Sequence, residues 1–235
     1  MSYPQPMPGE EGEKKGLLLR GVADLEKGFF YQVISSLLLA IATVILLTAV
    51  GTFLLTNPED IETILKIAST SIVAAGVVAI LGLIISIVGF IKILNGFKTI
   101  GAADNKYSIG ATGVKLLVAG IILALLGMII ILPGAMAGSV GAILGGIGLL
   151  GLGGLLLVIG AILMIVALWR LSDLEEGSLI KIGVILLIVG ALISQDGGSL
   201  LTFIGTILVY MGLRKIREKL EAEVSQSQPA APQPL

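Results

Sequence analysis

The feature that most constrains the fold is a long stretch without charge. Residues 116–169, between Lys115 and Arg170, contain no Asp, Glu, Lys or Arg. As one helix this stretch would extend about 80 Å at about 1.5 Å per residue, whereas the hydrocarbon core of a bilayer is about 30 Å thick. The stretch is too long for one membrane span and predicts two spans joined by a glycine-rich connection.

The composition agrees with a membrane protein. Hydrophobic residues make up 56% of the 235 residues and charged residues only 13%, against about 25% charged in a soluble domain. The chain has no Cys and no His, so it lacks thiol chemistry, the commonest metal ligand and the usual acid or base at neutral pH. The net charge of −1 gives no bias toward nucleic acid. We expect no enzymatic activity, catalytic residue, cofactor or metal, and no nucleic-acid partner.

Apolar runs predict an all-α, polytopic six-helix transmembrane bundle over residues 17–213. The expected spans are about 30–55, 67–94, 114–132, 149–169, 178–194 and 198–213, with a polar loop at 98–114. Outside the bundle we predict a disordered cytoplasmic tail at 1–16, a charged cytoplasmic helix at 214–224 and a disordered Pro/Gln-rich tail at 225–235.

Three segments allow more than one interpretation. Residues 17–28 form either an amphipathic helix in the membrane interface or a cytoplasmic extension of the first span. Pro133 is expected to break the third helix, which leaves residues 133–148 as an outer loop, a helix extension or a re-entrant segment. The last two spans are near the lower length limit for crossing a bilayer, so a shallow re-entrant hairpin is the alternative to two full crossings.

The distribution of Lys and Arg predicts the orientation. With six spans and the N-terminus inside, every one of the 15 basic residues except Lys66 falls on an inner segment. We therefore expect a multi-pass membrane protein with both termini in the cytoplasm.

Glycine spacing predicts how the helices pack. Glycines seven residues apart occur in five of the six expected spans, and this interval keeps one stripe of a helix facing its neighbour. Because glycine permits the closest approach between membrane helices, we expect a structural packing role for these pairs: Gly82/Gly89, Gly120/Gly127, Gly153/Gly160, Gly183/Gly190 and Gly205/Gly212.

Other candidate sites have simpler explanations. Gly146, Gly148 and Gly151 match the G-x-G-x-x-G dinucleotide pattern, but no strand precedes them, so helix packing is the better interpretation. Glu59, Asp60 and Glu62 could hold a hard cation, although acids at a helix start also complement the helix dipole. Lys92 and Lys181 enter predicted spans near their inner ends, where they can reach the headgroups.

Three motifs resemble an archaeal family of multi-pass membrane proteins, the domain of unknown function 973. They are residues 16–21 (GLLLRG), Tyr107-Ser-Ile-Gly110 with Gly113, and residues 203–215 (FIGTILVYMGLRK). The resemblance covers roughly residues 16–217. It implies an archaeal plasma membrane and supplies no activity or site residue.

The function expected from these observations is that of a non-enzymatic membrane scaffold or interaction protein. Its partners would be the lipid bilayer and cytoplasmic proteins bound through the Pro-rich tails. The alternative is a channel or carrier for a small neutral or apolar solute, because no charge that would couple transport to ions lies at mid-membrane.

Overall fold

The described residues of the chain are helical almost throughout. The computed structural model describes residues 8–55, 61–174, 177–193 and 198–227. These residues form the α-helices α1 (Pro8–Leu55), α2 (Ile61–Ala103), α3 (Ser108–Met136), α4 (Val140–Leu171), α5 (Ser178–Leu192) and α6 (Gly198–Ser227), with a 3₁₀ turn η2 (Asn105–Tyr107) between α2 and α3. Five of the helices are long and apolar enough to cross a membrane, and α5 is shorter. The predicted all-α polytopic class is confirmed.

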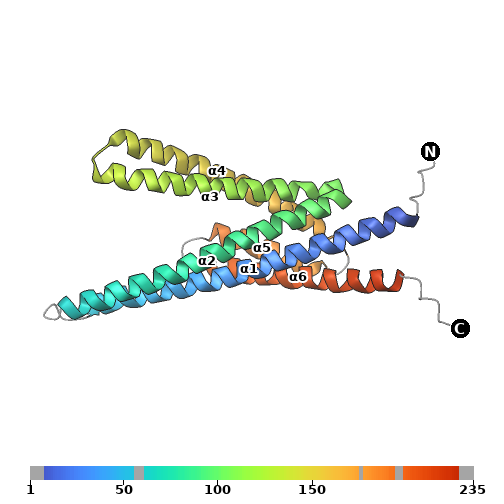
Figure 1. Ribbon diagram of the computed structural model, residues 1–235, viewed down its shortest axis with the longest axis horizontal. Coiled ribbons are helices and arrows are strands. Elements are labelled where there is room, and N and C mark those ends of the chain that lie inside the picture. The colour runs from blue at the N-terminus through green and yellow to red at the C-terminus, as the bar shows by residue number, and fades with distance from the viewer. Residues whose placement is uncertain (1–7, 56–60, 175–176, 194–197, 228–235) are drawn as a thin grey trace.

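Consecutive helices pair into three hairpins: α1 with α2, α3 with α4, and α5 with α6. The α1/α2 and α3/α4 hairpins diverge away from the end of the molecule at which α1 begins and α6 ends (Figure 1). The α5/α6 hairpin contacts α1 through α6 and α4 through α5. The bundle is therefore three hairpins rather than a ring of six equivalent helices.

The shared core lies at one end of the three hairpins. Leu25 of α1, Phe97 of α2, Leu168 of α4, Ile180 of α5 and Leu213 of α6 are completely buried in one cluster. Further members of this cluster come from η2 and the start of α3: Tyr107, Ala111 and Val114. Toward the other end, apolar side chains face outward. Leu47 and Ile129, for example, are each 65% exposed, as expected for surfaces that contact lipid.

The N-terminal boundary differs from the prediction. Residues 8–16, predicted to be part of a disordered tail, begin α1, and α1 continues through residues 17–28 into the first apolar run. The helical-extension alternative for residues 17–28 therefore describes this segment. Pro8 is compatible with helix because it is the first residue of α1, where its missing N–H has no helical partner to lose. Residues 1–7 lie outside the described part.

The connection between α3 and α4 also differs from the prediction. Pro133 does not end α3, which continues to Met136, and α4 begins at Val140 instead of near Leu149. Gly138 makes the turn with a φ of +66°, a left-handed conformation that favours glycine. The Ser139 side chain caps α4 by accepting a hydrogen bond from the Ala142 backbone N–H at 3.5 Å. Residues 133–148 are thus helix extensions around a tight turn.

Two further boundaries extend helices that were expected to stop. The predicted loop at 98–114 is mostly helical, because α2 reaches Ala103 and α3 begins at Ser108. The predicted separate helix at 214–224 is the continuation of α6, which also includes residues 225–227 of the predicted Pro/Gln-rich tail. Residues 228–235 lie outside the described part.

Candidate functional site: an apolar groove between two hairpins

Glycines form the contact between α3 and α4 within their hairpin. A Cβ atom added at Gly120 would lie 2.8 Å from the Gly153 carbonyl oxygen, and one added at Gly153 would lie 2.8 Å from the Gly120 carbonyl oxygen. Gly127 has the same relation to Gly146, and Gly160 to Gly113. The two backbones are in direct contact at three successive levels, with no space for a side chain.

The other hairpins contain similar contacts. Gly183 of α5 faces Gly205 of α6, and a Cβ atom added at either would lie within 2.8 Å of the other's carbonyl oxygen. The remaining predicted glycines also lie against a partner helix: Gly89 against Gly28, Gly82 near Ser35 and Leu38, Gly190 against Gly198 and Thr202, and Gly212 against Ile180. The two helices of each hairpin are therefore in close contact with each other through glycines.

The G-x-G-x-x-G motif does not form a common surface. Gly146 packs on α3, whereas a Cβ atom added at Gly148 or Gly151 would meet nothing within 4 Å. The three glycines face different sides of α4, and nothing in their arrangement resembles a phosphate-binding turn at a helix start.

Between the α1/α2 and α3/α4 hairpins lies a groove of about 510 Å³, open along one side. Its walls come from one face of α2 and one face of α3: Leu83, Ser86, Ile87, Phe90, Ile91 and Leu94, opposite Lys115, Val118, Ala119, Ile121, Ile122 and Leu125. This volume lies within the range of about 300–1,000 Å³ typical of small-molecule sites.

Of the described side chains that line the groove, two carry a polar group. The Ser86 hydroxyl donates to the Gln32 Oε1 atom at 3.1 Å, and Gln32 Nε2 donates to the Ser86 carbonyl oxygen at 3.0 Å. The Ser86 hydroxyl is thus engaged within the α1/α2 hairpin. The other polar group is the ammonium of Lys115, which lies at the end of the groove nearest the shared core and η2.

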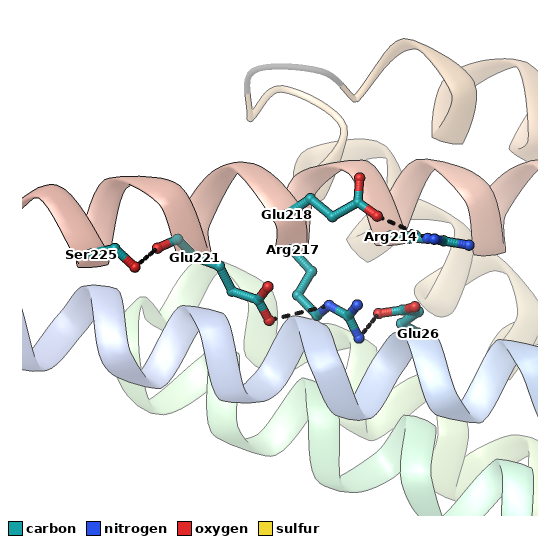
Figure 2. A network of polar contacts seen from close by, with 6 residues as sticks. All are labelled: Glu26, Arg214, Arg217, Glu218, Glu221 and Ser225. Carbon is teal, nitrogen blue, oxygen red and sulfur yellow. Dashed lines mark hydrogen bonds and ion pairs between the residues drawn. The ribbon is translucent and has the colours of Figure 1, made fainter.

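Ion pairs connect the hairpins at the charged end of the molecule. Figure 2 shows Arg217 of α6 between Glu26 of α1 and Glu221 of its own helix. Its Nη1 atom lies 2.8 Å from Glu26 Oε2, and the Glu26 side chain is only 8% exposed. In the same region Lys15 of α1 pairs with Glu223 of α6 at 3.2 Å. These contacts hold the charged ends of α1 and α6 together.

The two lysines predicted to enter spans have carboxylate partners. Lys92 lies 3.2 Å from Asp24 of α1, and Lys181 lies 3.0 Å from Asp173, which follows α4. Both pairs connect consecutive elements at the charged end. In the connection after α2, the side-chain hydrogen bond from Lys106 lowers the pKa of Asp104 below its ordinary value.

The possible cation site at Glu59, Asp60 and Glu62 involves side chains that the structure does not describe. Glu59 and Asp60 lie outside the described residues, as does the Glu62 side chain. Within the part of the chain that the structure describes, no three His, Cys, Asp or Glu side chains gather in a way that could hold a metal ion.

Sequence reasoning did not find the groove. Its apolar residues resemble any lipid-facing surface, and in the sequence Lys115 is one of several basic residues on an inner segment. The one sequence signal that could have distinguished it is the position of Lys115, which directly precedes the uncharged run and therefore borders the membrane.

The fold and the groove define a class: an integral membrane protein built from apolar helical hairpins. Within this class the chain belongs to the family described as protein of unknown function (DUF973), which matches residues 19–235. The resemblance drawn from the three motifs is therefore confirmed, and the match reaches the last residue of the chain. No curated protein and no solved structure matches the chain.

Proposed function

We propose that this protein is a non-enzymatic scaffold of the plasma membrane that holds an apolar membrane component between its α1/α2 and α3/α4 hairpins. The observation that carries the proposal is the groove between α2 and α3, which is open to the side and lined almost entirely by hydrocarbon. An apolar occupant would replace the loosely packed lipid that otherwise fills such a space, gaining dispersion contacts on both walls.

The arrangement of the hairpins supports a holding role. Each pair of helices is closed by its own backbone contacts, so an occupant of the groove need not separate them. The hairpins meet in a shared core at one end, which fixes their relative position there. The walls of the groove are therefore rigid elements rather than loops.

The orientation in the proposal has the charged end in the cytoplasm, because basic residues concentrate on the inner side of membrane proteins. The Lys15–Glu223 pair brings the charged ends of α1 and α6 together, so the start of α1 and the end of α6 lie on the same side. We include cytoplasmic protein partners of these segments in the proposed function. Deletion of residues 1–7 and 228–235 should release such partners without changing the groove.

Neither of the two cavities described favours the channel or carrier alternative. The larger one is lined by α2 and α3 alone, and the smaller one by four residues of α2. A solute path across the membrane requires lining from several helices along its whole length. We therefore keep the scaffold as the proposed function.

Photo-crosslinking tests the proposal. A photoreactive amino acid at Ile122, which lines the groove and is 52% exposed, is activated in native membranes, and the adducts are identified by mass spectrometry. Leu47 is the control because it is 65% exposed on another face. We expect one class of adduct enriched at Ile122, and its loss when Ala119→Phe fills the groove but not when Ala40→Phe adds the same ring to an exposed face of α1. Equal adduct patterns at both positions would refute the proposal.

A further inference from the structure

We infer that the groove binds one anionic lipid of the cytoplasmic leaflet, with an acyl chain between α2 and α3 and the headgroup on Lys115. This inference rests on the proposed function and names the occupant. Three independent features support it: the length of the groove, the position of the charge that lines it, and the absence of a competing carboxylate among the described residues.

The length of the groove corresponds to one leaflet. On α2 the lining runs from Leu83 to Leu94, a rise of about 16 Å at about 1.5 Å per residue. Half of a hydrocarbon core of about 30 Å is about 15 Å. One extended acyl chain could therefore contact the walls from the headgroup level to the middle of the membrane. A transmembrane helix of a partner would instead need an apolar surface across both leaflets.

The charge lies at the headgroup end of this groove. Because α2 and α3 are joined through η2, Lys115 and Leu94 line the end near the connection, whereas Leu83 and Leu125 line the far end. Lys92, two residues before Leu94 on α2, pairs with Asp24 at 3.2 Å, which marks the depth at which charged groups occur on α2. A phosphate joined to a chain in the groove would thus lie within reach of the Lys115 ammonium.

The Lys115 ammonium is available for an anion. Among the residues that the structure describes, no carboxylate lies within 4.0 Å of it, in contrast to Lys15, Lys92, Lys106 and Lys181, which each pair with an acid. A lysine binds phosphate as a point charge, and near a membrane surface each such contact raises the affinity for anionic lipid by about five-fold. The groove therefore combines an apolar wall for the chain with a cation for the headgroup.

Native mass spectrometry of the full-length protein in mild detergent tests the inference. The protein is incubated with phosphatidylglycerol and phosphatidylcholine that carry identical acyl chains, and the two bound species are counted. We expect wild type to retain phosphatidylglycerol in preference, and Lys115→Gln to lower the ratio of the two lipids about five-fold. The matched control is Lys215→Gln, which removes from α6 a charge that is also exposed and should leave the ratio within two-fold of wild type.

Two further measurements identify which part of the lipid is recognised. Ala119→Phe should abolish the retention of both lipids, whereas Ala40→Phe should retain both. Glycerol phosphate, which has the headgroup charge but no chains, should not displace the lipid. Displacement by glycerol phosphate would mean that the site recognises free phosphate, and it would overturn the inference.

The remaining outcomes separate this inference from the proposed function. The headgroup assignment is wrong if Lys115→Gln leaves the ratio of bound phosphatidylglycerol to phosphatidylcholine at the wild-type value. It is also wrong if Lys115→Gln lowers this ratio no more than Lys215→Gln does. If crosslinking at Ile122 yields a polypeptide or a zwitterionic lipid, the scaffold proposal stands and the anionic-lipid inference falls. Because Lys115 is exposed and outside the core, its substitution should not unfold the protein, and the fluorescence of Trp169 verifies this.

Discussion

The contact between α3 and α4 at Gly120 gives a quantitative test of the hairpin structure. A methyl group at this position would lie 2.8 Å from the Gly153 carbonyl oxygen and 2.9 Å from the Leu157 backbone nitrogen. The first distance is about 0.6 Å short of the 3.4 Å at which ordinary contact begins. Both obstacles are backbone atoms of a helix, so Gly120→Ala can be accommodated only if α3 and α4 move apart.

The magnitude follows from two opposing effects. Alanine is favoured over glycine inside a helix by about 1 kcal/mol, while forcing an extra group into a closed contact costs about 1–3 kcal/mol. Gly151→Ala, on the same hairpin, is the matched control because its added methyl group would meet nothing within 4 Å. Both variants gain the same helix preference of alanine over glycine, so this contribution cancels when their free energies of unfolding are compared. We therefore expect Gly120→Ala to be less stable than Gly151→Ala by about 1–3 kcal/mol.

Unfolding in mixed micelles with increasing sodium dodecyl sulfate measures this difference. The chain contains one tryptophan, Trp169 on α4, so its fluorescence reports on this hairpin without further labels. If the two variants have the same free energy of unfolding within about 0.5 kcal/mol, the backbones are not in contact at Gly120, since overpacking there costs more than that. The double variant with Gly153→Ala should be destabilised further than Gly120→Ala.

Three other predictions concern the charged end and the membrane topology. Glu26→Gln removes the carboxylate that lies 2.8 Å from the partly buried Arg217 guanidinium. In the same assay we expect the free energy of unfolding to fall by about 1–3 kcal/mol, which is less than for a fully buried ion pair because Arg217 keeps some contact with solvent. Asp104→Asn should lower the free energy of unfolding by less than about 1 kcal/mol at neutral pH, because the ion pair between Asp104 and Lys106 is exposed. The pKa of Asp104 is lowered in the folded protein, so the difference in stability between wild type and variant should disappear as the pH falls below the ordinary pKa value of 3.8. Cysteines introduced at Ser139 and Ser225 should react with an impermeant thiol reagent from opposite sides of the membrane, and reaction from the same side would refute the topology.

The glycine positions were predictable because their spacing follows directly from helix geometry. A seven-residue interval keeps a stripe on one side of a helix, and the structure places Gly120 and Gly127 against α4, with Gly153 and Gly160 against α3. The same interval extends to Gly113, which was not among the predicted packing residues, and to Gly146, for which packing was predicted only as part of the G-x-G-x-x-G motif. What the spacing does not specify is the partner helix, because a glycine stripe fits any neighbour that approaches closely.

The helix ends were less predictable because polar composition does not by itself stop a helix. Residues 8–16 are rich in Glu and Lys, both good helix formers, and they continue α1 although they were predicted to be disordered. Pro133 removes one backbone hydrogen bond but lies only a turn from the end of α3, so the loss is small. The groove was unpredictable for a different reason: it depends on the angle between two hairpins, which no local pattern encodes.

The short α5 has a consequence for the membrane around the protein. Its 15 residues rise only about 22 Å, less than the average hydrocarbon thickness of about 30 Å, whereas α1 and α2 extend much farther. A bilayer that keeps apolar side chains covered must thin beside α5 and regain its full thickness beside the α1/α2 hairpin. We expect the protein to impose a gradient of thickness on its lipid surroundings and to accumulate where membranes of different thickness meet.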